Sequence, residues 1–132
     1  MMGRLGPTRS KDFDRGNAPG PFLVTPDEAP DPLSMNVVVK IGSEKTWKGN
    51  TSCYSASPAQ VVAYVARHQS LLPGTVIGMG TVAECCGLDR DEWIDPGAMA
   101  EIRFDGLGVL RTPFPAHIGA SDQSRWGSRP DL

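Results

Sequence analysis

The sequence predicts a small α+β domain that is mostly β, and three observations lead to this prediction. The 132 residues suffice for one domain, and hydrophobic residues, at 39%, can supply its core. The 15 glycines and 12 prolines make turns frequent and long helices unfavourable. Short β-branched stretches bounded by turn residues recur along the chain, while the clearest helix signals surround a single stretch.

The first expected element is a short strand at Phe22–Thr25. It lies in a proline-rich stretch that otherwise has the pattern of a loop, because proline removes a hydrogen-bond donor from a strand ladder. The next is Met35–Ile41 (MNVVVKI), a β-branched strand bounded by turn residues. Lys45–Lys48 is expected to return as the second strand of a hairpin, which Gly49-Asn50 would end.

The main helix is expected near residues 58–70. Ser57 suits the N-cap, Pro58 fits the first helical position, and Gln60 completes a Ser-x-x-Gln capping box. One face at helical spacing is formed by Val61, Val65, His68 and Leu72. Pro73-Gly74 would stop the helix.

The sequence pattern of the second half of the chain predicts a further strand and a hairpin. Thr75–Ile77 is expected to be a short strand that leads into the glycine-rich turn Gly78–Thr81. Ala100–Phe104 alternates apolar and polar residues, as a half-buried strand does. Asp105-Gly106 is a hairpin signal, which makes Val109–Thr112 the partner strand.

Composition and charge disfavour several classes of protein. Fifteen acidic and 13 basic residues leave a net charge of −2, which argues against a nucleic-acid binder. No apolar run approaches the length that spans a membrane, and the first residues lack the apolar core of a signal peptide. Three cysteines, of which Cys85 and Cys86 are adjacent, make a poor disulfide framework and suggest a reducing cytoplasm.

The common catalytic and metal-binding motifs are absent. His68 is interpreted as a packed or partly exposed histidine on the helix face, and His117 as a solvated one. Cys85 and Cys86 can be structural thiols or a redox pair, but no further ligand lies at zinc spacing.

Two local patterns suggest a binding site. Lys11 stands beside Asp12 and Asp14, and a lysine paired with acids stays cationic and can donate to a carboxylate. In Gly78–Thr81, glycines let backbone N–H groups approach an anion, and the threonine hydroxyl adds a donor. A solvated charge cluster and a plain turn are the alternative interpretations.

Taken together, these motifs resemble the C-terminal part of the fumarylacetoacetate hydrolase family. The resemblance rests on SKDFD, then GP, LVT, DE and DP, then LLPGTVIGMGTVAECCGL, and finally WIDPG and EIRFDGLGVLR in this order. The corresponding segments are Ser10–Asp14, Gly20–Asp31, Leu72–Leu88 and Trp93–Arg111. We therefore expect a leader at 1–10 without a family match, a partial family domain at 11–115, and a flexible tail at 116–132.

The resemblance implies a mixed β-roll, a divalent-metal site and a homodimer. Members of the family cleave, decarboxylate or isomerise 2-oxo and 2,4-dioxo acids, including products of aromatic catabolism. Mg²⁺ is the expected cofactor, since it chelates the 2-oxo carboxylate and stabilises the enolate that forms as the bond breaks.

The resemblance also assigns roles to three residues. Lys11 matches the active-site lysine, which donates to the substrate oxygens near the metal. Thr81 matches the threonine of the glycine turn that contacts substrate, and Gly80 allows a close backbone approach. Arg15 stands where the family often has a threonine, so that contact is not assigned.

The sequence departs from the family pattern at the metal site. The family ligands, a Glu-x-Glu pair and an Asp, lie upstream of the lysine, but the ten residues before Lys11 contain no carboxylate. Two turns also lack the family's aspartate after Pro-Gly, at Thr75 and Ala98, and Glu84 replaces a glycine. We therefore expect no metal ligand within this chain.

Three hypotheses follow. The chain can be part of a 2-oxo acid enzyme that pairs with a missing N-terminal half or forms a homodimer. It can be a non-catalytic remnant or binding module of the same fold. It can also be a thiol redox protein that uses Cys85 and Cys86, which requires a depressed thiol pKa.

Overall fold

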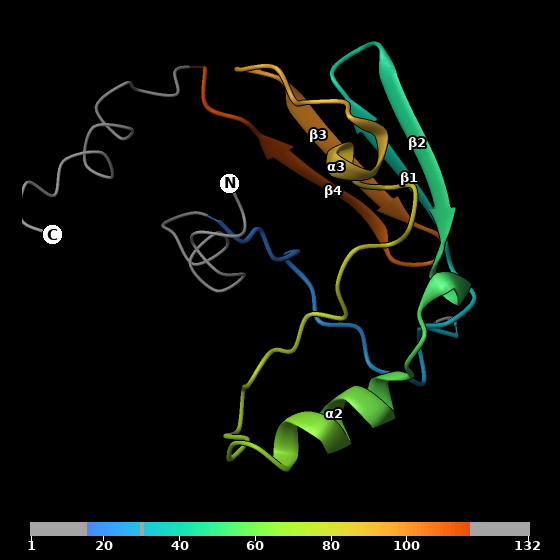
Figure 1. Cartoon of the computed structure of the whole chain (residues 1–132), viewed down its shortest axis with the longest axis vertical. Helices are drawn as coiled ribbons and strands as arrows, with labels where there is room; N and C mark the ends of the chain where they lie inside the picture. The colour runs from blue at the N-terminus through green and yellow to red at the C-terminus, as the bar shows by residue number, and fades with distance from the viewer. Residues whose placement is uncertain (1–15, 30, 117–132) are drawn as a thin grey trace, which may run out of the picture.

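One antiparallel sheet of four strands dominates the structure, a computed structural model that describes residues 16–29 and 31–116 (Figure 1). The strands are β1 (Asn36–Ile41), β2 (Lys45–Asn50), β3 (Met99–Phe104) and β4 (Gly108–Pro113). Their order in the sheet is β2-β1-β3-β4, so that β1 and β3 are central and the other two form the edges. The mostly β fold expected from the sequence is confirmed.

Two hairpins build this sheet, and the short-range turn signals predict both. Gly42 lies between β1 and β2 with a φ of +58°, and Gly106 between β3 and β4 with a φ of +83°. Both values lie in the left-handed region that glycine adopts without strain. In the sheet, β1 pairs with β3, so that Val39 stands opposite Ile102.

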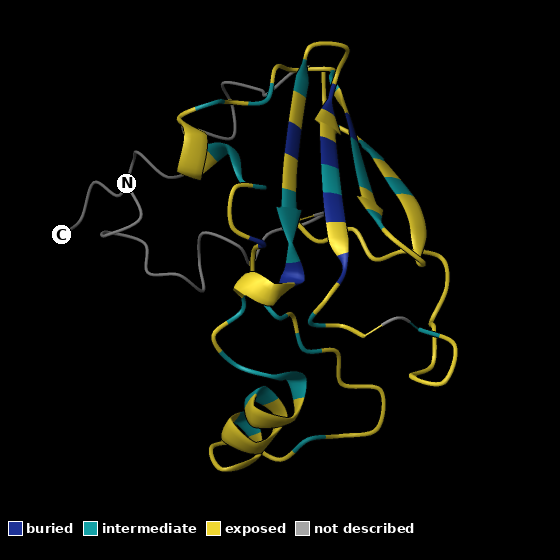
Figure 2. Ribbon diagram, turned by 90° about the vertical axis from the view of Figure 1, so that its right-hand side faces the viewer, coloured by how far each residue is buried: buried dark blue, intermediate teal, exposed yellow. Residues whose placement is uncertain are grey.

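The core lies on one face of the sheet. Alternate residues of β1 are buried, as are Trp47 on β2 and Ala100 on β3, and the loop residue Val82 packs against them (Figure 2). The cluster of buried residues consists of Val37, Val39, Ile41, Trp47, Val82 and Ala100. The opposite face carries Lys40, Glu101 and Arg111, and the Arg111 guanidinium donates to the Glu101 carboxylate over 3.0 Å.

The main helix, α2, spans Pro58–Ala66. Its predicted capping box is present, because the Ser57 side chain accepts from the Gln60 backbone N–H and the Gln60 side chain accepts from the Ser57 N–H. The helix ends four residues earlier than expected, and the N–H groups of His68 and Gln69 close a turn on the Val65 carbonyl instead. Figures 1 and 2 show that α2 stands apart from the sheet and is exposed along much of its surface.

The packed helix face that includes His68 is not observed. No residue of α2 is buried, and His68 and Leu72 are exposed. The His68 ring instead donates through Nδ1 to the Tyr64 carbonyl over 3.0 Å and lies 4.7 Å from the Tyr64 ring. On the face predicted from the helical spacing, Val61 and Val65 are partly buried, whereas the end with His68 and Leu72 is exposed.

Two predicted strands are wrong and one boundary is shifted. Phe22–Thr25 and Thr75–Ile77 are irregular, because neither pairs with another strand. Gly49-Asn50 continues β2 rather than ending it, since both residues pair with β1. The expected tail begins at residue 116, and residues 117–132 lie outside the described residues.

Two short helical segments complete the fold. The 3₁₀ turn η1 (Thr51–Cys53) follows β2 directly, and the Asn50 side chain caps it by accepting from the Ser52 N–H. The short helix α3 (Gly87–Arg90) ends at Asp91, which has a φ of +53°. Across 16–29 and 31–116, no helix is long and apolar enough to cross a membrane.

Replacing Ser57 by alanine is expected to destabilise α2 locally by about 1 kcal/mol, because one N-terminal amide loses its acceptor. Amide hydrogen exchange measured by NMR should accelerate in the first turn of α2 and change little in the sheet. Ser55→Ala is the control, since Ser55 is exposed and lies outside the cap. Equal effects of the two substitutions on α2 would contradict the capping role.

Candidate functional site

The glycine turn singled out from the sequence lies on an irregular segment next to the core. Gly80 has a φ of +92°, which favours glycine, and a Cβ built there would meet nothing within 4 Å. Thr81 is exposed, whereas the next residue, Val82, is buried in the core cluster. Thr81 is therefore exposed to solvent, while the residue that follows it is held in the core.

Two hydrogen bonds between this turn and the segment after β2 hold the turn in place. The Tyr54 hydroxyl donates to the Gly80 carbonyl over 3.1 Å, and the Ala83 N–H donates to Cys53 Sγ over 3.3 Å. The segment is itself tied to the sheet, because the buried Thr51 hydroxyl accepts from the Met35 N–H over 2.9 Å. Cys53 and Tyr54 were not identified from the sequence, where nothing links them to a turn nearly 30 residues away.

Gly49 on β2 provides the space in which the turn packs. A Cβ at this position would lie 2.7 Å from the Ala83 carbonyl oxygen, 2.8 Å from Val82 Cγ1 and 2.9 Å from Cys85 Sγ. These distances are shorter than real Cβ contacts, so only glycine fits here without displacing the segment. Contacts before and after Thr81 therefore fix its position.

Tyr54→Phe is expected to reduce the free energy of unfolding by about 1 kcal/mol, since one hydrogen bond is lost and the Gly80 carbonyl remains accessible to water. Urea denaturation should show this loss, and hydrogen exchange should be faster in the turn. Tyr64→Phe is the matched control, because Tyr64 is exposed on α2 and its hydroxyl makes no hydrogen bond within the described residues. Equal losses in the two variants would contradict the anchoring role.

The Tyr54 hydroxyl should also make the free energy of unfolding depend on pH. Burial raises the pKa of Tyr54 above its usual value of 10.0, and the neighbouring Cys53 and Cys85 add to the rise. The folded chain then holds a proton that the unfolded chain releases above about pH 10, so stability falls as the pH rises through this range. The decline measured between about pH 9 and 11 should be smaller in Tyr54→Phe, and an unchanged decline would contradict this assignment.

The Cys85 thiol lacks the property that the redox hypothesis requires. Burial raises the pKa of Cys85, which is the opposite of the depressed thiol pKa that the redox hypothesis requires. Cys86 occupies the N-cap position of α3 and makes no side-chain capping bond. The pKa of Cys85 argues against the thiol hypothesis and favours a structural thiol.

Glu84, the unexpected acid of this loop, is already paired. It adopts a φ of +65°, and its carboxylate lies 3.3 Å from the Arg90 guanidinium. The Arg90 Nε also donates to the Glu84 carbonyl over 2.9 Å. These contacts give Glu84 a structural partner in α3.

The described residues do not fit a Mg²⁺ site. No group of three or more His, Cys, Asp or Glu side chains that could hold a metal ion occurs in 16–29 and 31–116. Mg²⁺ needs several hard oxygen ligands in octahedral geometry, which single carboxylates do not supply. Lys11, Asp12, Asp14 and His117 lie outside the described residues, so the lysine predicted to act with Thr81 has no described position.

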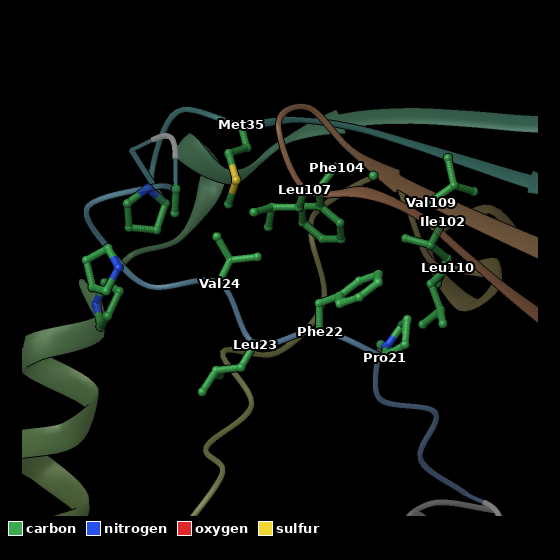
Figure 3. Close-up of a pocket in the computed structure, with 16 residues that line it drawn as sticks. Pro21, Phe22, Leu23, Val24, Met35, Ile102, Phe104, Leu107, Val109 and Leu110 are labelled. Atoms are coloured by element: carbon green, nitrogen blue, oxygen red, sulfur yellow. The ribbon is translucent and has the colours of Figure 1, made fainter.

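A second feature is an apolar groove of about 680 Å³ between the segment 20–32 and the sheet (Figure 3). None of the described residues that line it is charged. Its main apolar residues are Phe22, Val24, Ile102, Phe104, Leu107 and Leu110. The sequence predicted only a short strand at Phe22–Thr25 within an otherwise loop-like stretch, and no motif in it pointed to a groove.

Comparisons with known proteins found a family and relatives of similar sequence. A family model described as fumarylacetoacetate (FAA) hydrolase C-terminal matches residues 1–114, a span that starts ahead of the boundary expected at residue 11. An uncharacterized protein of Staphylococcus haemolyticus is 32% identical over 104 residues, which cover 78% of this chain and 35% of the relative. An uncharacterized protein of Staphylococcus aureus is 31% identical with the same coverage. The chain thus spans about a third of the length of these curated relatives.

Solved structures show a similar fold. A 2-keto-3-deoxy-D-arabinonate dehydratase complexed with magnesium and 2,5-dioxopentanoate superposes with a TM-score of 0.51 at 22% identity. The superposition covers 73% of this chain and 34% of that one. A hexagonal crystal form of 2-keto-3-deoxyarabinonate dehydratase gives the same TM-score and identity over 72% and 33%.

Proposed function

This chain belongs to the fumarylacetoacetate hydrolase C-terminal family, and we propose that it supplies the substrate-contacting turn of an enzyme that acts on a 2-oxo or 2,4-dioxo acid. The observation that carries the proposal is the fixed Gly80-Thr81 turn, which is exposed at Thr81 and anchored on either side. A preorganised donor of this kind stabilises negative charge without reorganising during the reaction.

The proposed roles follow from the chemistry of the side chains. The Thr81 hydroxyl donates to an oxygen of the 2-oxo acid, and the glycine at position 80 leaves the backbone open to the substrate. Lys11 is proposed as the cationic donor to the same oxygens, where it would stabilise the enolate that forms as a bond to the carbonyl-adjacent carbon breaks. Whether the reaction is hydrolysis, decarboxylation or isomerisation depends on groups beyond these donors.

We further propose Mg²⁺ as the cofactor of the assembled enzyme. Support comes from the family and from the dehydratase of similar fold, which is complexed with magnesium. No ligand set occurs in 16–29 and 31–116, and the resemblance places the family's ligands upstream of the lysine, so we propose that they come from polypeptide that this chain does not span. The proposed compartment is the cytoplasm, and the proposed assembly is a homodimer or a pair with the missing half.

Complementation tests this function. The chain is co-expressed with the part of the Staphylococcus haemolyticus relative outside its matched residues, and hydrolysis of an acylpyruvate is measured with Mg²⁺. Lys11→Ala should abolish turnover, and Thr81→Ala should lower it by about 100-fold, the size expected for a lost oxyanion donor. Thr46→Ala is the control, because Thr46 is exposed on the opposite face of the sheet.

The alternative is a non-catalytic binding module, which the exposed apolar groove favours. The same experiment separates the two. A complex that forms but turns over no 2-oxo acid, or does so equally well without Lys11, would contradict the enzyme and support the module.

A further inference from the structure

Two of the three thiols lie against the same residue beside the Thr81 turn. Cys53 Sγ accepts from the Ala83 N–H over 3.3 Å. Through its carbonyl, Ala83 also adjoins Cys85, because the Ala83 oxygen and Cys85 Sγ lie 2.7 Å and 2.9 Å from the point where a Cβ on Gly49 would stand. The fold thus brings Cys53 next to a residue two positions before Cys85, although the two cysteines are far apart in the sequence.

The pKa of Cys85 reflects the same neighbourhood. Burial raises this pKa most, the Arg90 guanidinium opposes the rise, and a negative charge on Cys53 adds to it together with two nearby acids. The pKa of Tyr54 is raised by burial and then by Cys53 and Cys85. The two thiols are therefore close enough for their charges to interact with each other and with the hydroxyl that holds Gly80.

The two thiols differ in their access to solvent. Cys53 is exposed at the end of η1, whereas Cys85 is half-buried and packs against the core cluster. A dissolved reagent therefore reaches Cys53 first. The raised pKa makes Cys85 a poor first nucleophile, but it does not prevent Cys85 from attacking a sulfur that the fold holds beside it.

Cys86 is a poorer partner for Cys85 than Cys53 is. Adjacent residues have Cα atoms about 3.8 Å apart, which is less than the roughly 4.4–6.8 Å that a disulfide normally spans. A bridge between Cys85 and Cys86 would therefore be strained. Cys86 occupies the N-cap position of α3 and is not among the described side chains that pack against the core cluster.

We propose that Cys53 and Cys85 form a modification site for low-molecular-weight disulfides, at which an internal Cys53–Cys85 disulfide forms. The Cys53 thiolate attacks the small disulfide, which gives a mixed disulfide on Cys53 and releases one small thiol. Cys85 then gives up its proton and attacks the Cys53 sulfur, which forms the internal bond and releases the second small thiol. The protein loses two protons and two electrons, and the small disulfide takes them up.

This bond would act on the Thr81 turn. Both sulfurs are free thiols in the structure, so they have to approach each other to form it. Cys53 Sγ then leaves the Ala83 N–H, and one of the two hydrogen bonds that hold the turn is lost. Oxidation should therefore loosen the turn and weaken the binding of a 2-oxo acid there, a consequence that rests on the proposed function.

The test treats the 132-residue chain with glutathione disulfide at neutral pH, alkylates the remaining thiols and maps tryptic peptides by mass spectrometry. Cys53 lies in the tryptic peptide 49–67, and Cys85 and Cys86 lie in the peptide 68–90. We expect these two peptides to be linked, with a loss of two hydrogen atoms. The link should form at least about tenfold faster than in concentrated urea, since the fold holds the thiols together.

Two variants identify the thiols that react. Cys86→Ser is the matched control and should form the link as the parent chain does. Cys85→Ser should stop at the glutathione adduct on Cys53. Circular dichroism of each variant shows whether the sheet remains folded. Four outcomes would overturn the proposal, namely a bridge within the peptide 68–90, a dimer linked through Cys53, a parent chain that stops at the adduct, and equal rates of linking with and without urea.

The effect on the turn has its own measurements. The Ala83 amide should exchange hydrogen faster in the oxidised chain, and an unchanged rate would contradict the loosening. In the complex of the complementation experiment, oxidation should weaken the binding of oxalate with Mg²⁺, and a reducing agent should restore it. Cys53→Ser should not respond, because the serine hydroxyl forms no disulfide and can still accept from the Ala83 N–H. A link in the chain with no oxalate binding by the reduced complex would contradict the proposed function alone, whereas oxalate binding without any link would contradict the thiol pair alone.

Discussion

Replacing Trp47 by alanine is expected to remove about 3–5 kcal/mol from the free energy of unfolding. Trp47 is only 3% exposed, lies on β2 opposite Val39, and belongs to the core cluster. Its Nε1 donates to the Glu92 carboxylate over 2.7 Å, which ties the segment after α3 to the sheet. Small domains have total stabilities of about 5–15 kcal/mol, so this variant should be largely unfolded in mild denaturant.

Urea denaturation followed by far-UV circular dichroism measures this loss. Trp93→Ala is the matched control, because the Trp93 side chain is 65% exposed and its substitution should cost less than about 1 kcal/mol. Trp47→Phe should cost less than Trp47→Ala, since it removes the Nε1 donor and part of the ring but keeps an aromatic ring in the core. If Trp47→Ala and Trp93→Ala were equally stable, the core described for this sheet would be wrong.

Gly49→Ala is expected to cost about 2–3 kcal/mol, an effect typical of overpacking. The added methyl would clash with the Ala83 carbonyl and with Val82, which is itself part of the core. Relief requires the turn or β2 to move, so the position of Thr81 should change as well. In the complemented complex, the same substitution should weaken the binding of oxalate, a stand-in for a 2-oxo enolate.

Gly78→Ala provides the control for this second prediction. A Cβ at Gly78 meets nothing within 4 Å, and the position does not have a positive φ. The free energy of unfolding of Gly78→Ala should therefore stay within about 0.5 kcal/mol of the parent chain, as for most surface substitutions. A Gly49→Ala variant as stable as Gly78→Ala would contradict the close packing of the turn on β2.

The elements that the sequence predicted correctly are those set by local chemistry. Both hairpins combine β-branched or alternating strands with a glycine in the turn, and the capping box at Ser57 involves residues only three positions apart. By contrast, Phe22–Thr25 and Thr75–Ile77 have strand-like composition but no partner. Pairing depends on the distant chain, which local composition does not reveal.

The same distinction applies to the site. Gly80 and Thr81 could be singled out because their turn is contiguous in the sequence, and the family resemblance gave them a role. Gly49, Cys53 and Tyr54 support that turn from about 30 residues away, and only the folded backbone brings them together. The prediction of a packed helix face that includes His68 was wrong for the same reason, since periodicity does not specify what packs against that face.

The most direct test of the central claim is a calorimetric titration with Mg²⁺ in the presence and absence of oxalate. It is done on the 132-residue chain alone and on its complex with the part of the Staphylococcus haemolyticus relative outside the matched residues. We expect no oxalate-dependent Mg²⁺ binding by the chain alone, and we expect binding by the complex that Thr81→Ala weakens. Oxalate-dependent binding by the chain alone, or none by the complex, would contradict it.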